Sequence, residues 1–496
     1  MSSPYWLSTN TGDWEVVIGL EVHAQVASHS KLFSGAATNF NAEPNSNVAL
    51  VDAAFPGMLP VLNKHCVEQA VKTGLGIHAQ INKFSMFDRK NYFYPDLPQG
   101  YQISQFYYPI VGEGHLDITL DKGIIKKVRI ERIHLEQDAG KSIHDLHVKN
   151  TCIDLNRSGI ALMEIVTKPD MRSPEEAMAF VKALRLLLRY LGTSDGNMEE
   201  GSLRADVNVS VNRPGKPLGT RAEIKNVNSI RFIGQAIEVE ALRQTKLIES
   251  GEGVLQETRL YDHNKQETRS LRSKEDAPDY RYFPDPDLLP IHLAPEYIES
   301  LRLGMPELPD AKRQRFMEEY GLPLYDATLM VDDLETTHYY ENTVKETAGW
   351  KKYKDKNTAK LVSNWLTGDL FGLLNKENKT VLESPISSTH LAELVDLMQD
   401  NVISGRIAKE VFLDMWNTHK APKSIVDEKG LVQITDTSAL ESMIADTLKE
   451  NPKMLADYKA GKEQLFGFFV GQIMKKSAGK ANPQMVNDLL KAALSQ

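Results

Sequence analysis

Hydrophobic and polar residues alternate near the start of the chain, a pattern typical of a β-strand. In WEVVIGLEVHAQV (14–26), Glu21, His23 and Gln25 fall on one face and apolar residues on the other, because strand side chains alternate with a period of two. The pattern predicts a strand with one face against a core and one polar face.

Three more segments predict strands that carry polar groups. In VRIERIHLEQDAG (128–140), the same parity groups His134, Glu136 and Asp138. The alternation in NMEEGSLRADVNVSV (197–211) places valines on one face and four polar side chains on the other: Arg204, Asp206, Asn208 and Ser210. In IALMEIV (160–166), Glu164 interrupts an apolar run that suits a strand buried on both faces. A lone ionised glutamate there costs several kcal/mol unless a partner compensates it.

Helical periodicity marks the rest of the chain. SPEEAMAFVKALRLLLRYLG predicts a helix that Ser173 caps, Pro174 begins, Glu176 supports through a capping box and Gly192 ends. A second helix is expected near 229–249. The fold class is therefore α+β, with a mixed or antiparallel sheet in residues 1–290, a helical connector over 291–345 and an all-helical tail over 346–496.

Composition narrows the class of protein. Hydrophobic residues make up 41% and charged residues 25% of the 496, as in soluble globular proteins, and no apolar run approaches the length of a membrane helix. A net charge of −9 argues against a generic nucleic-acid coat. The first residues resemble neither a signal nor a transit peptide, and two cysteines, Cys66 and Cys152, suit a reducing compartment, so we expect a cytoplasmic protein.

Glu164 needs a cation, and the residues alone leave two choices open. If the acidic strands are neighbours, carboxylate oxygens with one imidazole nitrogen suit Mg²⁺ or Mn²⁺. The alternative is a structural ion pair with an arginine such as Arg157 or Arg185. No phosphate-binding loop or dinucleotide fingerprint occurs in the sequence.

Two stretches combine aromatic and basic residues around prolines: DRKNYFYPDLPQGYQIS (88–104) and DYRYFPDPDLLP (279–290). Aromatic rings beside cations can stack on single-stranded nucleic acid. The alternative is that these rings hold proline-rich loops against the core.

Several blocks together resemble the B subunit of the glutamyl/aspartyl-tRNA(Gln/Asn) amidotransferases, the GatB/GatE family. They include IGLEVHAQ, the aromatic stretches, HLEQDAGK, DLNRSGIALMEIVTKPD, AEIKNVNSIRF and GFFVGQIMKKSAGKANPQMVNDLL, in order over about 12–494. The resemblance implies a cradle-shaped catalytic domain, a helical linker and a helical tail that contacts tRNA. It also implies an ATP-dependent ligase that converts Glu-tRNA(Gln) or Asp-tRNA(Asn) to the amidated form. Ammonia would come from a partner glutaminase of the amidase type (GatA), and a small third partner (GatC) would complete a heterotrimer.

The resemblance also carries residue roles to this chain. It places magnesium ligands at Glu21, His23, Glu136 and Glu164, and a lysine at the mouth of an ammonia channel at Lys90. Blocks that line the cleft for ATP and the tRNA acceptor end contain Arg204, Asp206, Asn208 and Lys225. Many members bind structural zinc at positions that read Ser34, Ala36, Ala49 and Asp52 here, so we expect no structural zinc and a segment held by packing alone.

Two rival interpretations stay open at this point. One is a non-catalytic tRNA-binding scaffold within the same complex. The other is a metal-dependent phosphoesterase, against which the absence of an H-x-H pair argues. Residues 459–496 carry six lysines against one glutamate and one aspartate, a patch that suits contacts with tRNA phosphates.

Overall fold

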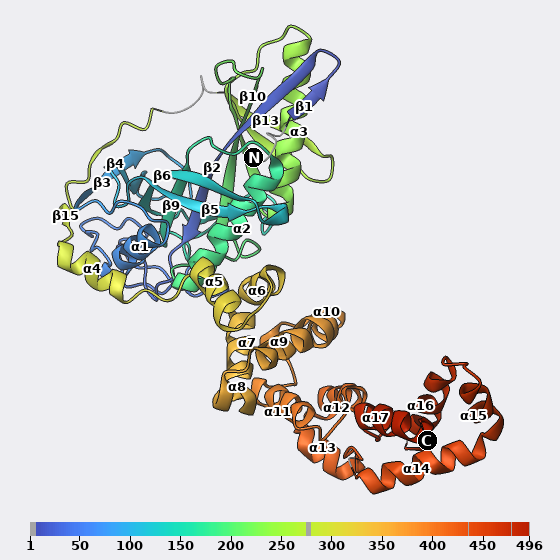
Figure 1. The fold of residues 1–496 in the computed structure, drawn as a ribbon. Coiled ribbons are helices and arrows are strands. Elements are labelled where there is room, and N and C mark those ends of the chain that lie inside the picture. The colour runs from blue at the N-terminus through green and yellow to red at the C-terminus, as the bar shows by residue number, and fades with distance from the viewer. Residues whose placement is uncertain (1–5, 274–278, 435, 478, 496) are drawn as a thin grey trace. The chain divides into compact units, whose positions relative to one another are not determined.

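The alternating segments form strands of one 13-stranded sheet in the computed structural model (Figure 1). The structure describes residues 6–273, 279–434, 436–477 and 479–495, and the chain divides into two units, Met1–Pro309 and Asp310–Gln496. The strands of the sheet are β1 (Trp6–Thr9), β2 (Gly12–Gln25), β3 (Phe84–Asn91), β4 (Tyr101–Tyr108), β5 (Gly114–Thr119), β6 (Ile125–Gln137), β9 (Ala161–Thr167), β10 (Leu203–Asn212), β11 (Ala222–Val227), β12 (Glu257–Asp262), β13 (Glu267–Ser273), β14 (Phe283–Pro284) and β15 (Ile291–His292).

The topology places strands from distant parts of the sequence side by side. The main order is β13-β12-β11-β10-β2-β9-β6-β4-β3-β14, while β1, β5 and β15 pair with β2, β6 and β3. Every pairing is antiparallel except that of β11 with β12. The α+β class and the mixed sheet are therefore confirmed. A separate ribbon joins β7 (Lys141–Ile143) to β8 (Cys152–Asp154).

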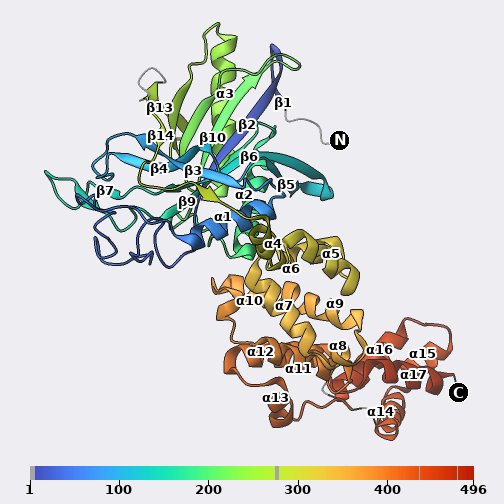
Figure 2. The ribbon, with the colours of Figure 1, turned by 90° about the vertical axis from the view of Figure 1, so that its left-hand side faces the viewer.

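Helices cover one face of the sheet. Leu20 and Val22 on β2 are buried in one core with Val71 of α1 (Lys64–Gly76), Leu184 of α2 (Pro174–Leu191) and Ile237 of α3 (Ile230–Glu249). Figures 1 and 2 show these helices against the sheet, and α2 packs on α3. Because β2 alternates, its odd-numbered residues, including Glu21 and His23, lie on the opposite face.

The predicted helix at 173–192 begins and ends where the sequence indicates, but one detail was wrong. Ser173 accepts a hydrogen bond from the backbone N–H of Glu176, and Gly192 ends the helix in the left-handed conformation (φ +67°). The Glu176 carboxylate accepts from the backbone N–H of Arg172 at 2.6 Å and pairs with Lys126, so it does not close a capping box on Ser173. The second predicted helix is α3, capped by Ser229.

A buried ion pair anchors the segment around residues 31–52, so the expectation that packing alone holds it was wrong. The ammonium of Lys31 lies 3.1 Å from Asp52 Oδ2, and both side chains are almost fully buried. The same carboxylate oxygen accepts from Ser34 Oγ at 3.1 Å and from the backbone N–H of Ala49 at 2.9 Å. Lys31 also donates to the carbonyl of Leu155 at 3.3 Å, which ties this segment to the turn before β9.

Residues 291–309 belong to the first unit, because β15 pairs with β3 and α4 (Pro295–Leu303) packs on α1. The described part of the second unit contains helices and no strand, as predicted, apart from one isolated bridge between Ile434 and Ala481. Its helices are α5 (Pro309–Glu319), α6 (Leu324–Val331), α7 (Leu334–Glu346), α8 (Ala348–Tyr353), α9 (Lys356–Trp365), α10 (Phe371–Lys376), α11 (Ser388–Gln399), α12 (Gly405–Thr418), α13 (Pro422–Lys429), α14 (Thr437–Glu450), α15 (Pro452–Lys459), α16 (Leu465–Lys476) and α17 (Pro483–Leu494). Among the helices that the structure describes, none is long and apolar enough to span a membrane.

Candidate active site

The sheet register brings the three acidic strands together. On the middle strand β9, Glu164 lies opposite His23 of β2 on one side and opposite His134 of β6 on the other. On β6, Glu136 is two residues beyond His134 and therefore shares its face. These strands are therefore neighbours, which is the condition on which the predicted metal site depends.

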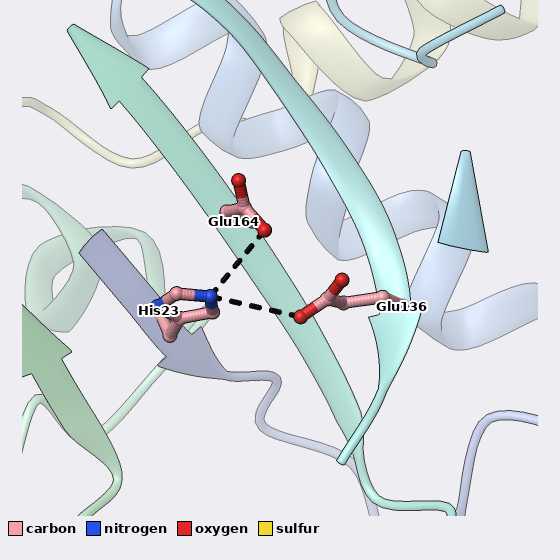
Figure 3. A group of neighbouring side chains, drawn as sticks. All are labelled: His23, Glu136 and Glu164. Atoms are coloured by element: carbon pink, nitrogen blue, oxygen red, sulfur yellow. Dashed lines mark ion pairs between the residues drawn. The ribbon is translucent and has the colours of Figure 1, made fainter. Parts of the chain in front are cut away.

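The side chains of these strands form a tight cluster (Figure 3). His23 Nε2 lies 3.3 Å from Glu164 Oε2 and 3.7 Å from Glu136 Oε1. One ligand atom from each of these three residues lies within 4.8 Å of the other two, the arrangement that a single metal ion requires. One imidazole nitrogen and two carboxylates fit a divalent cation of the magnesium or manganese type.

A second histidine completes the cluster, and it was missing from the sequence-based ligand set. His134 Nε2 lies 3.3 Å from Glu164 Oε2 and 3.5 Å from Glu136 Oε2. Its position two residues before Glu136 on an alternating strand was the signal that could have identified it. Glu164 thus faces two imidazoles.

No described arginine pairs with Glu164, so the arginine alternative was wrong. Arg157 instead donates to the backbone carbonyls of Ala139 and Gly140, and its Nε lies 3.6 Å from Asp138 Oδ2.

Burial and the two histidines oppose each other in setting the charge of the cluster. Burial disfavours ionised Glu164, but His134 and His23 outweigh it and hold the pKa of that carboxyl well below its usual value. The pKa of Glu136 is lowered in the same way, against burial and mainly by His134. Burial alone would lower the pKa of His134, yet Glu164 and Glu136 raise it to about 9, and the pKa of His23 is also raised. The cluster therefore alternates negative and positive groups.

Glu21 lies one row away from this cluster. On β2 it stands two residues before His23, opposite Val166 and Asp206 of the flanking strands. Its Oε1 accepts a hydrogen bond from Asn208 Nδ2 at 3.1 Å. Burial, together with the charges of Glu164 and other acidic neighbours, raises its pKa. The structure thus brings three of the four expected ligands within mutual reach and places the fourth beside them.

A cavity of about 370 Å³ lies above these residues. Its lining includes every candidate residue named from the sequence except Arg204, whose guanidinium donates to Asp138 at 3.0 Å. Lys225 pairs with Asp206 and Glu223; burial opposes its charge, yet these two carboxylates raise its pKa. Two further cations that the sequence did not single out, Arg132 and Arg221, also line the cavity.

The two aromatic stretches meet at the rim of this cavity. Phe283 of β14 pairs with Arg89 of β3. The ammonium of Lys90 lies 4.9 Å from the centre of the Tyr280 ring, and Phe106 stacks on Tyr282 at 4.0 Å. Tyr280, Tyr282 and Phe106 all line the cavity, so these rings do more than hold loops against the core.

Together, the fold and the cleft define an α+β catalytic domain followed by a helical extension. The chain belongs to the GatB/GatE family: residues 16–299 match the GatB/GatE catalytic domain, and residues 347–494 match the GatB domain. The resemblance seen in the sequence is thereby confirmed.

Curated relatives extend over the full chain. A protein of Granulibacter bethesdensis is 59% identical over 490 residues, and one of Pelagibacter ubique is 59% identical over 494, each covering 99% of both chains. A protein of Beijerinckia indica is 60% identical over 486 residues, 98% of this chain and 97% of its own. All three are named as the B subunit of an aspartyl/glutamyl-tRNA(Asn/Gln) amidotransferase.

Proposed function

We propose that this chain is the B subunit of a tRNA-dependent amidotransferase, an ATP-dependent carbon–nitrogen ligase that uses glutamine as its amide donor. Its product is Gln-tRNA(Gln), Asn-tRNA(Asn) or both. The observation that carries the proposal is the coincidence of full-length kinship with proteins of that name and a cleft in which carboxylates, imidazoles and cations converge.

The reaction explains why this cleft needs cations more than nucleophiles. Ammonia cannot displace oxide from a carboxylate, so an oxygen of the misacylated side chain first attacks the γ-phosphorus of ATP, and ADP leaves. Ammonia then attacks the acyl phosphate carbon, and phosphate leaves. Negative charge develops on phosphate oxygens in the first step, and Lys225, Arg132 and Arg221 line the cavity where they can stabilise it.

His23, Glu136 and Glu164 would hold Mg²⁺, because their donor atoms are mutually within reach. When bound, Mg²⁺ neutralises charge on phosphate oxygens. Glu21, hydrogen-bonded to Asn208, is oriented beside this set and would complete the ligands named from the sequence. Lys90, held among tyrosine rings at the rim, would guide ammonia into the cleft.

The remaining assignments follow from the same family resemblance. Residues 1–290 would carry catalysis, 291–345 connect, and 346–496 contact tRNA. The amidase-type partner, GatA, would release ammonia from glutamine, and the small partner, GatC, would stabilise the heterotrimer. Since aminoacyl-tRNA is made and used in the cytoplasm, we place the complex there.

The test is an assay of the reconstituted complex with ATP, glutamine and each misacylated tRNA. We expect amidated tRNA and ADP in equal amounts. If Glu136→Gln leaves tRNA-dependent ADP formation intact, the acidic cluster is structural and this chain is a scaffold for chemistry elsewhere.

A further inference from the structure

A buried aspartate lies beneath a bulge at the rim of the cavity. On β3, one residue separates Met86 from Asp88. On β4, three residues separate their partners, Tyr108 and Ser104, so β4 bulges at this point. Asp88 shares a strand face with Lys90, which lines the cavity, yet Asp88 is fully buried. The bulge on β4 therefore covers this carboxylate.

Hydrogen bonds to the Asp88 carboxylate hold the bulge in place. Bulged residues lose regular ladder partners, and the backbone N–H groups of Phe106 and Tyr107 donate instead to Asp88 Oδ2, at 3.0 and 3.2 Å. Among the described atoms, none is a hydrogen-bond partner of Asp88 Oδ1. Burying a carboxylate with so few partners is costly. The protein thus maintains a costly group that fixes the backbone of two aromatic residues.

The bulge presents Phe106 to the segment that precedes β14. In the sheet, β3 lies between β4 and β14, and Phe106 stacks on Tyr282 with ring centres 4.0 Å apart and planes at 12°. The other side of the stack is fastened separately, because the Asn91 side-chain amide donates to the carbonyls of Tyr280 and Arg281 at 3.1 and 2.9 Å. Contacts outside the stack therefore hold both of its partners, and we call Phe106 and Tyr282 the aromatic wall.

The aromatic wall extends from solvent toward the acidic cluster. Both rings line the cavity of about 370 Å³, and Phe106 is 45% exposed. Burial, followed by the charges of Glu136 and Glu164, raises the pKa of Tyr282, which indicates that its hydroxyl lies near the cluster. The wall thus borders the place where the phosphoryl group would be transferred.

The proposed reaction needs protection from water at this place. Water can attack the same acyl phosphate carbon as ammonia; the bond to the phosphate oxygen then breaks, phosphate leaves, and the side-chain carboxylate of the misacylated tRNA is formed again. Each such event consumes an ATP without forming an amide. Active sites limit losses of this kind by excluding water.

We propose that the aromatic wall keeps water from the acyl phosphate, and that Asp88 is the positioning residue that holds the wall by fixing the bulge on β4. The inference rests on the proposed function, whose reaction forms that intermediate. Its signature is the ratio of tRNA-dependent ADP to amidated tRNA, which a merely structural role of these residues would not change.

The test removes one ring and leaves the hydrogen bonds of Asp88 in place. Phe106→Ala keeps the backbone N–H, and Phe106→Tyr keeps a ring that can stack. The matched control is Tyr107→Ala, because Tyr107 donates to the same carboxylate and is 58% exposed, but does not belong to the described lining of the cavity. The complete complex receives ATP, misacylated tRNA and either glutamine or ammonium chloride, and melting temperatures are measured alongside.

We expect Phe106→Ala to raise the ratio of ADP to amide about threefold or more with either nitrogen donor, because water then competes with ammonia. Phe106→Tyr and Tyr107→Ala should form ADP and amide in equal amounts, as the wild type should. Asp88→Ala should raise the ratio as Phe106→Ala does. Asp88→Asn should raise it less, since its amide oxygen can still accept both N–H groups, without the charge.

Equal amounts of ADP and amide in Phe106→Ala would overturn the inference. So would a ratio that rises with glutamine but not with ammonium, because the wall would then guide ammonia, and so would an equal rise in Tyr107→Ala. If Asp88→Ala does not fold, Asp88→Asn decides: an intermediate ratio supports its positioning role, and the wild-type ratio overturns it. A wild-type complex that forms no amide would refute the proposed function and the inference with it, whereas an active wild type with a coupled Phe106→Ala would refute the inference alone.

Discussion

Replacing Asp52 with asparagine tests whether the Lys31–Asp52 pair holds the first unit together. Both side chains are at most 2% exposed, so water cannot take the place of either partner. In Asp52→Asn, the shape of the side chain is kept, but the Lys31 ammonium loses its opposite charge and keeps only neutral acceptors, among them the Leu155 carbonyl, 3.3 Å away. Removing one partner of a buried ion pair costs about 3–5 kcal/mol, because the other charge is left uncompensated.

This magnitude translates into a measurable change in melting temperature. For a unit of 309 residues, each kcal/mol lowers the melting temperature by about 1.5 °C, so we expect a fall of about 5–8 °C in the transition of the first unit. Lys31→Met should also destabilise the unit, but less, since the Asp52 carboxylate keeps the Ser34 hydroxyl and the Ala49 N–H as donors. The double variant Lys31→Met/Asp52→Asn should lose less than the sum of the single losses.

Differential scanning calorimetry measures these changes, because it separates the transitions of two units. Glu267→Gln is the control: its ion pair with Arg269 is about half exposed, and such pairs contribute about 0–1 kcal/mol. Single variants at Lys31 and Asp52 that melt like the control would refute the reasoning. So would a double variant whose loss equals the sum, because the two charges would then not be coupled.

Four further predictions concern function. Glu164→Gln should leave a complex that binds tRNA and hydrolyses glutamine but forms no acyl phosphate, with partial recovery at high Mg²⁺; full activity per folded molecule would contradict a ligand role. Lys90→Ala should uncouple glutamine hydrolysis from amidation, and added ammonium should partly restore the product; equal losses with both donors would assign Lys90 another role. Replacing the exposed Lys459, Lys475 and Lys491 with glutamine should weaken tRNA binding. The slope of log binding constant against log salt concentration should fall by up to about one for each lysine that contacts a phosphate. An unchanged slope would mean that tRNA binds elsewhere. Burial lowers the pKa of His23, but Glu164 and Glu136 outweigh it and raise that pKa. Because the proton must leave His23 before its nitrogen can bind metal, Mg²⁺ binding should release protons, and the affinity for Mg²⁺ should rise with pH up to this raised pKa. Calorimetry in buffers of different ionisation enthalpy counts the protons released.

Strand parity predicted which residues share a face, and the reason is geometric. Side chains alternate strictly along a strand, so Glu21 with His23, and His134 with Glu136, had to point the same way. Parity says nothing about which strands are neighbours. The pairing of β2 with β9 joins residues about 140 positions apart, and the family resemblance, not the pattern, supplied that proximity.

The remaining misses share one cause, which is that local patterns do not record long-range contacts. Lys31 and Asp52 lie in a segment with little regular structure, where no periodicity indicates burial or pairing. The Glu176 carboxylate has several donors within reach. It accepts from Lys126 of β6 and from the backbone N–H of Arg172 instead of from the N–H of Ser173.

The two histidines explain how an acidic cluster can exist in a folded chain before any cation binds. Glu136 and Glu164 are mostly buried, and two ionised carboxylates this close would repel each other and resist burial. His23 and His134, both with raised pKa values, provide positive charge at 3.3–3.7 Å. A metal bound by His23 would replace one of these charges, while His134 would stay beside both carboxylates and keep them oriented. The same four side chains therefore stabilise the cluster before a cation binds and preorganise it for one, which a cluster of carboxylates alone could not do.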